Sequence, residues 1–157
     1  MLRLPCLQAA AVTLHARFGS RIVACGPGRT RLIESVRQGT AKRTAGAALY
    51  TNRIHRDDCV RVLAHLLEQE HMERLYIAVD DAPTPLDEVL CWIAEQLGVA
   101  PPPVLAEPAI KPGAETRPDP QTRLRSSKRC RNARLRASGF QFRYPSYKEG
   151  YAALLEA

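Results

Sequence analysis

The sequence predicts an α/β fold, and three neighbouring segments carry that prediction. Thr51 to Leu67 begins as a short extended segment and turns into an amphipathic helix pattern, with apolar residues at helical spacing. Arg74 to Asp80 alternates and is rich in β-forming residues, which is typical of a strand. Leu86 to Leu97 repeats apolar residues on one helical face. Such alternation of strand and helix patterns indicates a sheet with covering helices.

Length and composition are those of one globular domain. The chain has 157 residues, of which 45% are hydrophobic and 25% charged, so we expect residues 1–157 to form a single domain. No run of 18 apolar residues occurs, which excludes a membrane-spanning helix. Met1 to Phe18 has one early cation and an apolar middle, as signal peptides do. Because polar residues and Pro5 interrupt that run, we expect a helix or strand instead.

The cysteines argue against a metal site. The chain has 5 of them, no two form a Cys-x-x-Cys pair, and no His stands at metal-ligand spacing from one. Cys59 and Cys91 fall on apolar helix faces, where Cys behaves as a small hydrophobe. This usage favours the reducing cytoplasm and no zinc.

The positive charge is concentrated near the C-terminus. The formal net charge is +7, and Pro120 to Lys148 contains no Asp or Glu. A basic run can hold phosphates. This one has few aromatic residues and no nucleic-acid motif, so a solvated or anion-facing surface is favoured over nucleic-acid binding. Its crowded cations are Arg123, Arg125, Lys128, Arg129, Arg131, Arg134 and Arg136.

The first half of the chain gives a strand, a turn and a helix. Gly19 to Ala24 predicts a short buried strand that ends at Cys25, and Gly26-Pro27-Gly28-Arg29 is a strong turn signal. Apolar residues then recur at helical spacing until Gly39, so Pro27 to Gln38 is loop into helix. Thr40 to Ala48 is a polar loop of small residues.

The central helix is expected to follow the strand Tyr50 to His55 and to run to about Glu70. Asp57 and Asp58 stand where a helix N-terminus favours negative and capping side chains. The face expected to be buried consists of Cys59, Leu63, Leu66 and Leu67, with Val60 and Val62 beside them.

The next helix has clear start and stop signals. Thr84 to Asp87 reads as a capping box with Pro85 at the first helical position, and Gly98 ends the helix. Trp92 lies beside the apolar face, where we expect it to pack. Residues 101–120 form a Pro-rich internal loop.

The C-terminal segment predicts small α and β elements. Asn132 to Ala137 reads as a short basic helix ended by Gly139, after an extended stretch at Lys128 to Cys130. Phe140 to Tyr144 alternates as an edge strand does. A second capping box opens a terminal helix, and the residues that define these two features are Ser146, Glu149, Tyr147, Tyr151, Leu154 and Leu155.

Three stretches resemble extended and atypical short-chain dehydrogenases/reductases of the NAD-dependent epimerase/dehydratase type. They are Arg53-Ile54-His55-Arg56-Asp57-Asp58, the turn Gly26 to Arg29, and the tail from Lys128 to Leu155, which contains Tyr144-Pro145-Ser146-Tyr147. Cys25 stands where that family usually has Tyr. The resemblance implies a partial Rossmann-like parallel sheet with helices and a small C-terminal α+β cap. It also implies an NAD(P) cofactor and a nucleotide-sugar or other anionic substrate.

The resemblance implies a substrate site around Arg53. There Arg53 contacts an anionic substrate group, with Arg29, Asn52 and His55 near it. A guanidinium fork suits phosphate, although Gly26 to Arg29 is equally compatible with a sharp turn whose arginine is solvated. For His55, a hydrogen-bonded structural role is favoured over a catalytic one, because no Ser or Cys nucleophile stands beside it.

The motifs that such an enzyme needs for cofactor and catalysis are absent from these residues. Gly26-Pro27-Gly28 lacks a third glycine and contains proline, so it is no dinucleotide-binding turn. Tyr144 and Lys148 have Tyr-x-x-x-Lys spacing, but Pro145 and Ser146 place Tyr144 before the helix. We therefore assign no catalytic residue and expect a substrate-side half that is inactive alone.

Two further expectations concern partners. A half sheet exposes an edge and an apolar face, which predicts self-association or a partner chain. The alternative function is a non-catalytic module that binds anions or an acidic partner through the basic C-terminal segment.

Overall fold

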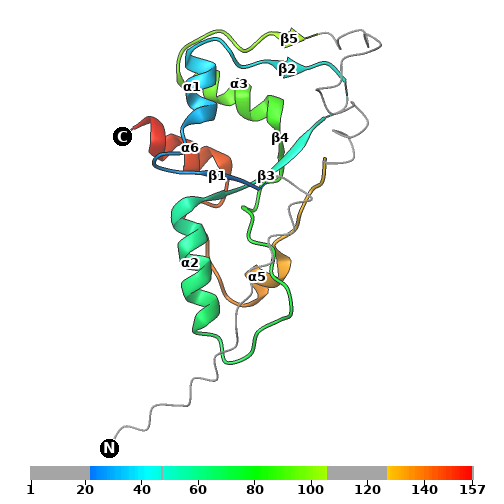
Figure 1. The fold of residues 1–157 in the computed structure, drawn as a ribbon, viewed down its shortest axis with the longest axis vertical. Helices are drawn as coiled ribbons and strands as arrows, with labels where there is room; N and C mark the ends of the chain where they lie inside the picture. Colours follow the sequence, from blue (N-terminus) through cyan, green and yellow to red (C-terminus); the bar gives the residue numbers. More distant parts are fainter. Residues whose placement is uncertain (1–21, 47, 106–126, 157) are drawn as a thin grey trace, which may run out of the picture.

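A computed structural model describes residues 22–46, 48–105 and 127–156 (Figure 1). Predictions for residues 1–21 and for most of the Pro-rich loop therefore lie outside the described residues, as do Arg123 and Arg125. Strands and helices carry the labels of Figure 1. Within the described ranges, no helix is long and apolar enough to cross a bilayer.

A three-stranded sheet lies at the centre of the fold. Strands β1 (Ile22–Cys25) and β3 (Tyr50–His55) pair in parallel, and β4 (Thr84–Pro85) pairs antiparallel with the other edge of β3. In the parallel register Cys25 lies beside His55, so both strands end at the same edge of the sheet. A second, two-stranded parallel sheet joins β2 (Arg43–Thr44) to β5 (Val104–Leu105), and β5 falls inside the predicted Pro-rich loop.

Helices cover both faces of the central sheet. Figure 1 shows α1 (Arg31–Arg37), α3 (Leu86–Gln96) and α6 (Tyr147–Leu155) on one side. On the other side lie α2 (Arg56–Leu67) and α5 (Ala133–Ala137). The result is the predicted α/β arrangement of a small parallel sheet with helices.

Each face has its own hydrophobic core. The upper core joins Cys25 to the inner faces of α1, α3 and α6. The lower core is formed by Ile54, Val62, Leu66, Leu135 and Phe140. Because alternate residues of a strand point to opposite faces, Cys25 at the end of β1 belongs to the upper core, whereas Ile54 of β3 belongs to the lower one.

Several predicted element boundaries are confirmed. The capping box at Ser146 and Glu149 opens α6. Gly39, Gly98 and Gly139 follow α1, α3 and α5 with φ of +67°, +65° and +89°, the left-handed conformation that ends helices. The strand at Tyr50–His55 has the predicted bounds.

The strand predicted at Arg74 to Asp80 is wrong. The Asp80 N–H donates to Arg53 O at 2.7 Å, but no ladder extends from it in the described residues. Leu75 and Ile77 are 53% and 36% exposed. Polar and apolar residues do alternate here, but the segment is a connection that is hydrogen-bonded to β3 only at Asp80.

The edge strand predicted at Phe140 to Tyr144 is also wrong. Phe140 is buried in the lower core, and the N–H groups of Arg143 and Tyr144 donate to the Asp58 carboxylate. A side chain therefore takes the backbone hydrogen bonds that a neighbouring strand would have needed.

The capping box at Thr84 does not form. Thr84 and Pro85 are used by β4, Thr84 Oγ1 donates to Ala82 O, and α3 starts one residue later at Leu86. Because Thr84 and Pro85 pair with β3, they do not form the helix cap that the sequence predicts.

The buried face of α2 differs from the prediction. The helix ends at Leu67, and its fully buried residues are Asp58, Val62 and Leu66. Leu63, Leu67 and Val60 are exposed instead. Apolar residues occur on two sides of this helix, and the buried side is the one that carries Asp58, Val62 and Leu66, of which only Leu66 belongs to the face expected to be buried.

Candidate functional site

The predicted site residues on β3 face opposite sides of the sheet. Thr51, Arg53 and His55 alternate with Asn52 and Ile54. Arg53 and His55 face α6, whereas Ile54 packs in the lower core. The structure therefore brings Arg53 and His55 together on one face and places Asn52 on the other.

Asn52 fastens the C-terminal segment to the sheet. Its side chain is buried, Nδ2 donates to Lys128 O at 2.9 Å, and Oδ1 accepts the Cys130 N–H at 2.9 Å. Both ends of the amide are thus engaged with backbone. The segment Lys128 to Cys130 runs along β3 through these two bonds.

Arg53 is the largest fully buried side chain of the described structure, at 1% exposure. Its Nη1 donates to Thr51 O at 3.2 Å and to Thr84 O at 3.4 Å, but Nε and Nη2 are buried without a hydrogen-bond partner. Each unsatisfied buried donor costs about 1–3 kcal/mol. Burial lowers the pKa of Arg53, and Tyr151 and Asp80 oppose that shift.

Asp80 lies near Arg53 in the same buried region. Burial raises the pKa of the Asp80 carboxyl to about 7, although attraction to Arg53 acts in the opposite direction. Burial also raises the pKa of Tyr151 to about 12 and that of Cys25 to about 11. At neutral pH the Cys25 thiol is therefore protonated and is not a nucleophile.

His55 caps helix α2 with its side chain. Nδ1 accepts the Asp57 N–H at 3.2 Å, and the ring stacks on Tyr144 with centroids 3.8 Å apart. Burial lowers the pKa of His55, so the ring is neutral at pH 7 and carries its proton on Nε2. Nδ1 is committed to the helix backbone in this geometry.

The turn after β1 brings Arg29 to the carboxyl edge of the parallel strands. Pro27 O accepts a hydrogen bond from Arg56 Nη1 at 2.8 Å, which ties the turn to the start of α2. Gly26 has φ of +139°, and a Cβ there would lie 2.9 Å from the Arg56 Cβ, so only glycine fits. Arg29 is exposed. Open α/β sheets bind ligands at this edge.

The turn does not fit the pyrophosphate of a dinucleotide. The Arg29 N–H is already bonded to Gly26 O at 2.8 Å, and Pro27 has no N–H to offer. A dinucleotide-binding turn instead leaves its backbone N–H groups open to the phosphates.

Asp58 has a structural role that its position in the sequence does not reveal. The sequence predicts only that it lies at the start of a helix, where a carboxylate is favoured. Its side chain is fully buried, accepts the N–H groups of Arg143 and Tyr144 at 2.9 and 2.8 Å, and pairs with Arg61 Nη1 at 2.7 Å. It holds the C-terminal segment against α2. No signal in the sequence links position 58 to positions 143 and 144.

Tyr144 lies outside α6, as predicted from Pro145 and Ser146, because that helix begins at Tyr147. Tyr144 and Lys148 therefore do not share a helix face. Among the described residues, no group of His, Cys, Asp and Glu is arranged to hold a metal ion.

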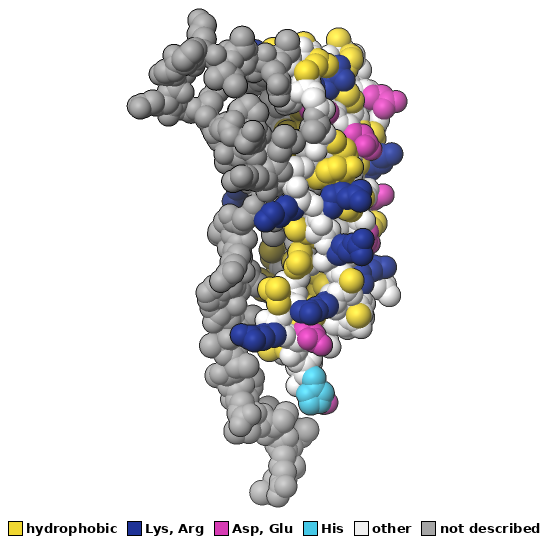
Figure 2. Space-filling view, turned by 90° about the vertical axis from the view of Figure 1, so that its right-hand side faces the viewer, with side chains coloured by type: hydrophobic (Ala, Val, Ile, Leu, Met, Phe, Trp, Pro, Cys, Tyr) yellow, Lys and Arg dark blue, Asp and Glu magenta, His cyan; other side chains and the backbone are white. Residues whose placement is uncertain are grey.

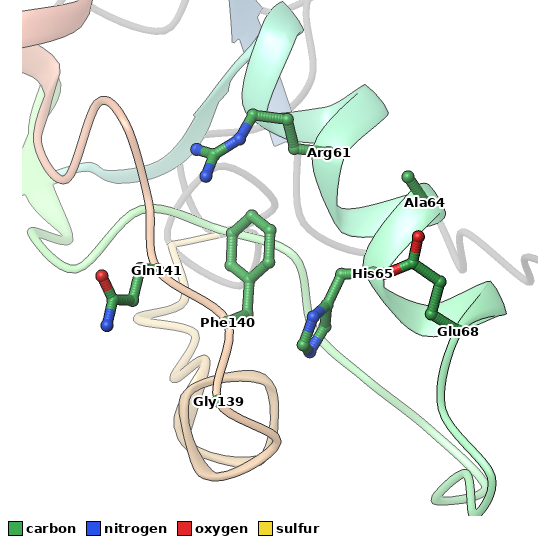
Figure 3. Close-up of a pocket in the computed structure, with 7 residues that line it drawn as sticks. All are labelled: Arg61, Ala64, His65, Glu68, Gly139, Phe140 and Gln141. Carbon is green, nitrogen blue, oxygen red and sulfur yellow. The ribbon is translucent and has the colours of Figure 1, made fainter.

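Two surface pockets occur in the part of the chain that the structure describes. One, of about 390 Å³, lies between α2 and Gly139 to Gln141 (Figure 3). The other, of about 330 Å³, is lined by buried Asp80 and by exposed groups that include Arg131. None of the four predicted site residues lines either pocket.

The basic C-terminal segment packs on the body of the protein. Arg129 lies over the Tyr50 ring at 5.0 Å, Arg134 donates to Leu75 O at 3.4 Å, and Arg136 is 3.6 Å from Asp81. Lys128 and Arg131 are exposed as well. Figure 2 shows Lys and Arg side chains spread along one face among hydrophobic ones, without a single dense patch.

The architecture defines the class of protein: an α/β fold with a small parallel sheet, helices on both faces and a turn at the carboxyl edge. It resembles the epimerase/dehydratase fold. A protein from Methylobacillus flagellatus, described as a proposed NAD-dependent epimerase/dehydratase, matches with a TM-score of 0.59 and 32% identity over 85% of this chain.

A second solved structure is also similar. A functionally unknown conserved protein from Silicibacter pomeroyi DSS matches with a TM-score of 0.70 and 28% identity over 87% of this chain. The chain spans 47% of this protein and 44% of the Methylobacillus flagellatus protein, about half of each. No family model and no curated protein matches the chain.

Proposed function

We propose that this chain provides the substrate-side half of an NAD-dependent epimerase/dehydratase, an enzyme that acts on a nucleotide-sugar or another anionic small molecule. The observation that carries the proposal is the 32% identity, over 85% of the chain, to the Methylobacillus flagellatus protein. The parallel strands support it, because Cys25 and His55 end together at an edge where such folds bind ligands.

Within that function, the anionic group of the substrate pairs with arginine. Arg53 has two unsatisfied donors, Nε and Nη2, and these form one edge of the guanidinium fork that binds phosphate or carboxylate in a bidentate manner. Because the fork is enclosed, the ligand reaches it only when the region around α6 opens. Arg29 is exposed at the same end of the sheet and attracts the anion first.

The remaining predicted residues shape this site. His55 holds the start of α2, and Asn52 holds the segment Lys128 to Cys130, so both fix β3 on either side of Arg53. NAD(P) supplies hydride transfer in enzymes of this type. The turn Gly26 to Arg29 does not fit that cofactor, so we propose that these 157 residues alone neither bind it nor turn over substrate.

Calorimetric titration tests both parts of the proposal. With UDP-glucose as the probe, we expect weak binding, with Kd of about 1 mM, and at least a tenfold loss in Arg29→Ala and Arg53→Met. Arg37→Ala is the control, since Arg37 is an exposed arginine at the other end of α1. No heat with UDP-glucose, or equal affinity in all variants, contradicts the substrate site.

Titration with NAD⁺ and NADP⁺ is a separate measurement. We expect no detectable binding, because the chain offers no open Gly-rich turn. Binding of either dinucleotide with a micromolar Kd would contradict the assignment of the cofactor site to residues other than these.

A second candidate function is a non-catalytic module that binds anions through the basic C-terminal segment. The observation in its favour is that five cations between Lys128 and Arg136 are all exposed. Three of them already have partners on the protein, which ranks this candidate second. Pyrophosphate binding that Arg123→Ala plus Arg131→Ala abolishes would favour it, and unchanged affinity would remove it.

A further inference from the structure

Three buried polar atoms on one face of β3 have no hydrogen-bond partner. They are Thr51 Oγ1, Arg53 Nε and Arg53 Nη2, and no other buried side-chain atom of the described residues shares this state. Because alternate residues of a strand share a face, Thr51 and Arg53 are neighbours on the same side of the sheet. Buried polar atoms of native proteins are nearly always paired, with protein, water or a ligand. Three such atoms in one place indicate a binding group.

The Arg53 guanidinium reaches back along β3 to Thr51. Its Nη1 donates to Thr51 O at 3.2 Å and to Thr84 O at 3.4 Å. Thr51 and Thr84 are direct partners in the pair that β3 forms with β4. These two bonds hold one end of the guanidinium, and Nε and Nη2 form the edge without partners. The unpaired hydroxyl therefore belongs to the residue whose carbonyl oxygen already holds the guanidinium.

The three atoms together match an anion with three oxygens. Nε and Nη2 present two parallel N–H groups, which suit two oxygens of a carboxylate or of a phosphoryl group. The Thr51 hydroxyl donates a third hydrogen bond. A carboxylate has only two oxygens, and the guanidinium uses both. A phosphoryl group has a further oxygen, which its tetrahedral shape carries out of the guanidinium plane.

We propose that Thr51 determines the specificity of the anion site at Arg53, because its hydroxyl binds a third oxygen of the ligand and so selects a phosphoryl group over a carboxylate. This inference rests on the proposed function, in which Arg53 binds the anionic group of the substrate. It narrows that group to a phosphate, as in a nucleotide-sugar.

The charges around Arg53 favour an anion. Tyr151 stays neutral at pH 7, because burial raises its pKa to about 12, so it does not cancel the guanidinium charge. Burial raises the pKa of Asp80 to about 7, so near neutral pH this carboxyl group carries only part of a charge. A phosphoryl group supplies the negative charge that these neighbours do not, which offsets the cost of burying the guanidinium.

Tyr147 covers the site loosely. Its ring centroid is 6.0 Å from the Arg53 guanidinium carbon, and its hydroxyl donates to Glu88 at 3.5 Å, which is long for an O–H donor. Neither of the two surface pockets is lined by Thr51 or Arg53. A ligand therefore enters only when the start of α6 moves, and small oxyanions are the probes that need the least movement.

Thermal unfolding of the full chain with inorganic phosphate or with formate, at equal concentration and ionic strength, tests the proposal. Arg53→Met reports the general effect of each salt, and binding is the Tm rise beyond it. We expect a rise of about 3 °C with phosphate in the wild type and a smaller one with formate. In Thr51→Val the phosphate rise should fall to that of formate, because valine keeps the shape of threonine without its hydroxyl.

Two matched variants complete this experiment. Thr51→Ser restores the hydroxyl and should keep the preference for phosphate. Thr44→Val removes the hydroxyl of an exposed threonine on β2, in the second sheet, and should behave as the wild type does. Circular dichroism verifies that each variant keeps the fold.

Urea denaturation without ligand separates binding from folding. Thr51 Oγ1 has no partner within the protein, so Thr51→Val should leave the midpoint unchanged or raise it. Thr84→Val removes a hydroxyl that donates to Ala82 O at 2.8 Å, so it should lower the midpoint. If Thr51→Val lowers the midpoint as Thr84→Val does, the hydroxyl serves the fold and the proposal is overturned.

Equal Tm rises with phosphate and formate in the wild type also overturn the proposal. So does a Thr51→Val variant that responds to phosphate as the wild type does, since the hydroxyl then binds only water. The proposed function is judged separately. UDP-glucose binding that Arg53→Met abolishes supports that function whatever Thr51→Val does, whereas phosphate selection through Thr51 without UDP-glucose binding supports the present inference and removes that substrate.

Discussion

Asp58 and Asp80 are both buried carboxylates, but the protein treats them in opposite ways. Asp58 accepts two backbone N–H groups and an Arg61 guanidinium, all within 2.9 Å. Asp80 lies near Arg53, whose Nε and Nη2 have no partner, and burial raises the pKa of Asp80 to about 7. The Asp58 carboxylate therefore has hydrogen-bond partners that offset its burial, whereas the burial of Asp80 is offset only in part.

This difference separates a structural junction from a candidate binding region. On the lower face of the sheet, Asp58 joins the start of α2 to the loop before α6, and its hydrogen bonds offset the cost of burying the charge. On the upper face, the hydrogen bonds of Arg53 offset the cost of its burial only in part, because Nε and Nη2 have no partner, and burial raises the pKa of Asp80. Unmet donors are tolerated where a ligand satisfies them, which is why we place the proposed anion contact at Arg53.

The largest expected effect is the loss of the Asp58 junction. Asp58→Ala leaves the part-buried N–H groups of Arg143 and Tyr144 without their acceptor and Arg61 without its ion pair. We expect the free energy of unfolding to fall by about 3–5 kcal/mol, measured by urea denaturation. Asp57→Ala is the control, because the Asp57 side chain is 39% exposed and pairs only at 3.6 Å or more.

An Asp58→Ala variant as stable as Asp57→Ala would mean that the C-terminal segment is held by its apolar contacts alone. The hydrogen bonds of Asp58 would then not be what distinguishes it from Asp80.

The second prediction concerns Asp80 and pH. The Asp80 pKa rises from its ordinary value of 3.8 to about 7 in the folded protein. Between these values the folded state binds a proton that the unfolded state has lost. Stability from this group is therefore complete below pH 3.8 and is lost as pH rises to about 7. The loss is at most about 4 kcal/mol.

Asp80→Asn removes this dependence, because an amide has no proton to lose. We expect the variant to equal the wild type below about pH 3.8 and to be more stable than it at pH 8, measured by urea denaturation at each pH. The depressed pKa of His55 acts in the opposite direction, since its contribution is lost as pH falls below 6.5. Both chains carry His55, so their difference isolates Asp80. Parallel pH profiles would show that Asp80 is not protonated.

Sequence patterns predicted the local elements well, because each depends on neighbouring residues. The strand Tyr50–His55, the Ser146 capping box and the glycines that end helices are of this kind. The failures all involve distant partners. Phe140 to Tyr144 alternates like a strand, yet Asp58, more than eighty residues earlier, takes its backbone donors.

The candidate site shows the same limit. The family motif identified Arg53, Asn52 and His55 as neighbours in sequence, but alternation along a strand sends Asn52 to the other face. The role of Asp80 had no sequence signal, since its burial next to Arg53 depends on how the segment after α2 returns to β3. The buried face of α2 was predicted only in part, since Leu66 is buried as expected but Leu63 and Leu67 are exposed.

The smallest expected effect on stability is that of Arg53→Met, and it sharpens the comparison most. Methionine fills a similar volume, removes the two unsatisfied donors and leaves Asp80 without its nearby cation. The first change stabilises and the second destabilises, so we expect the free energy of unfolding to change by less than about 2 kcal/mol at pH 5.

The pH profile should change more clearly than the stability itself. Without Arg53 the pKa of Asp80 rises further, because the attraction that opposes its burial is gone. The decline in stability should therefore extend to higher pH in Arg53→Met than in the wild type, by urea denaturation at pH 6 to 9. Asn52→Ala, on the other face of β3, should lower stability without moving that pH. If both variants shift it equally, Arg53 and Asp80 do not act as a pair.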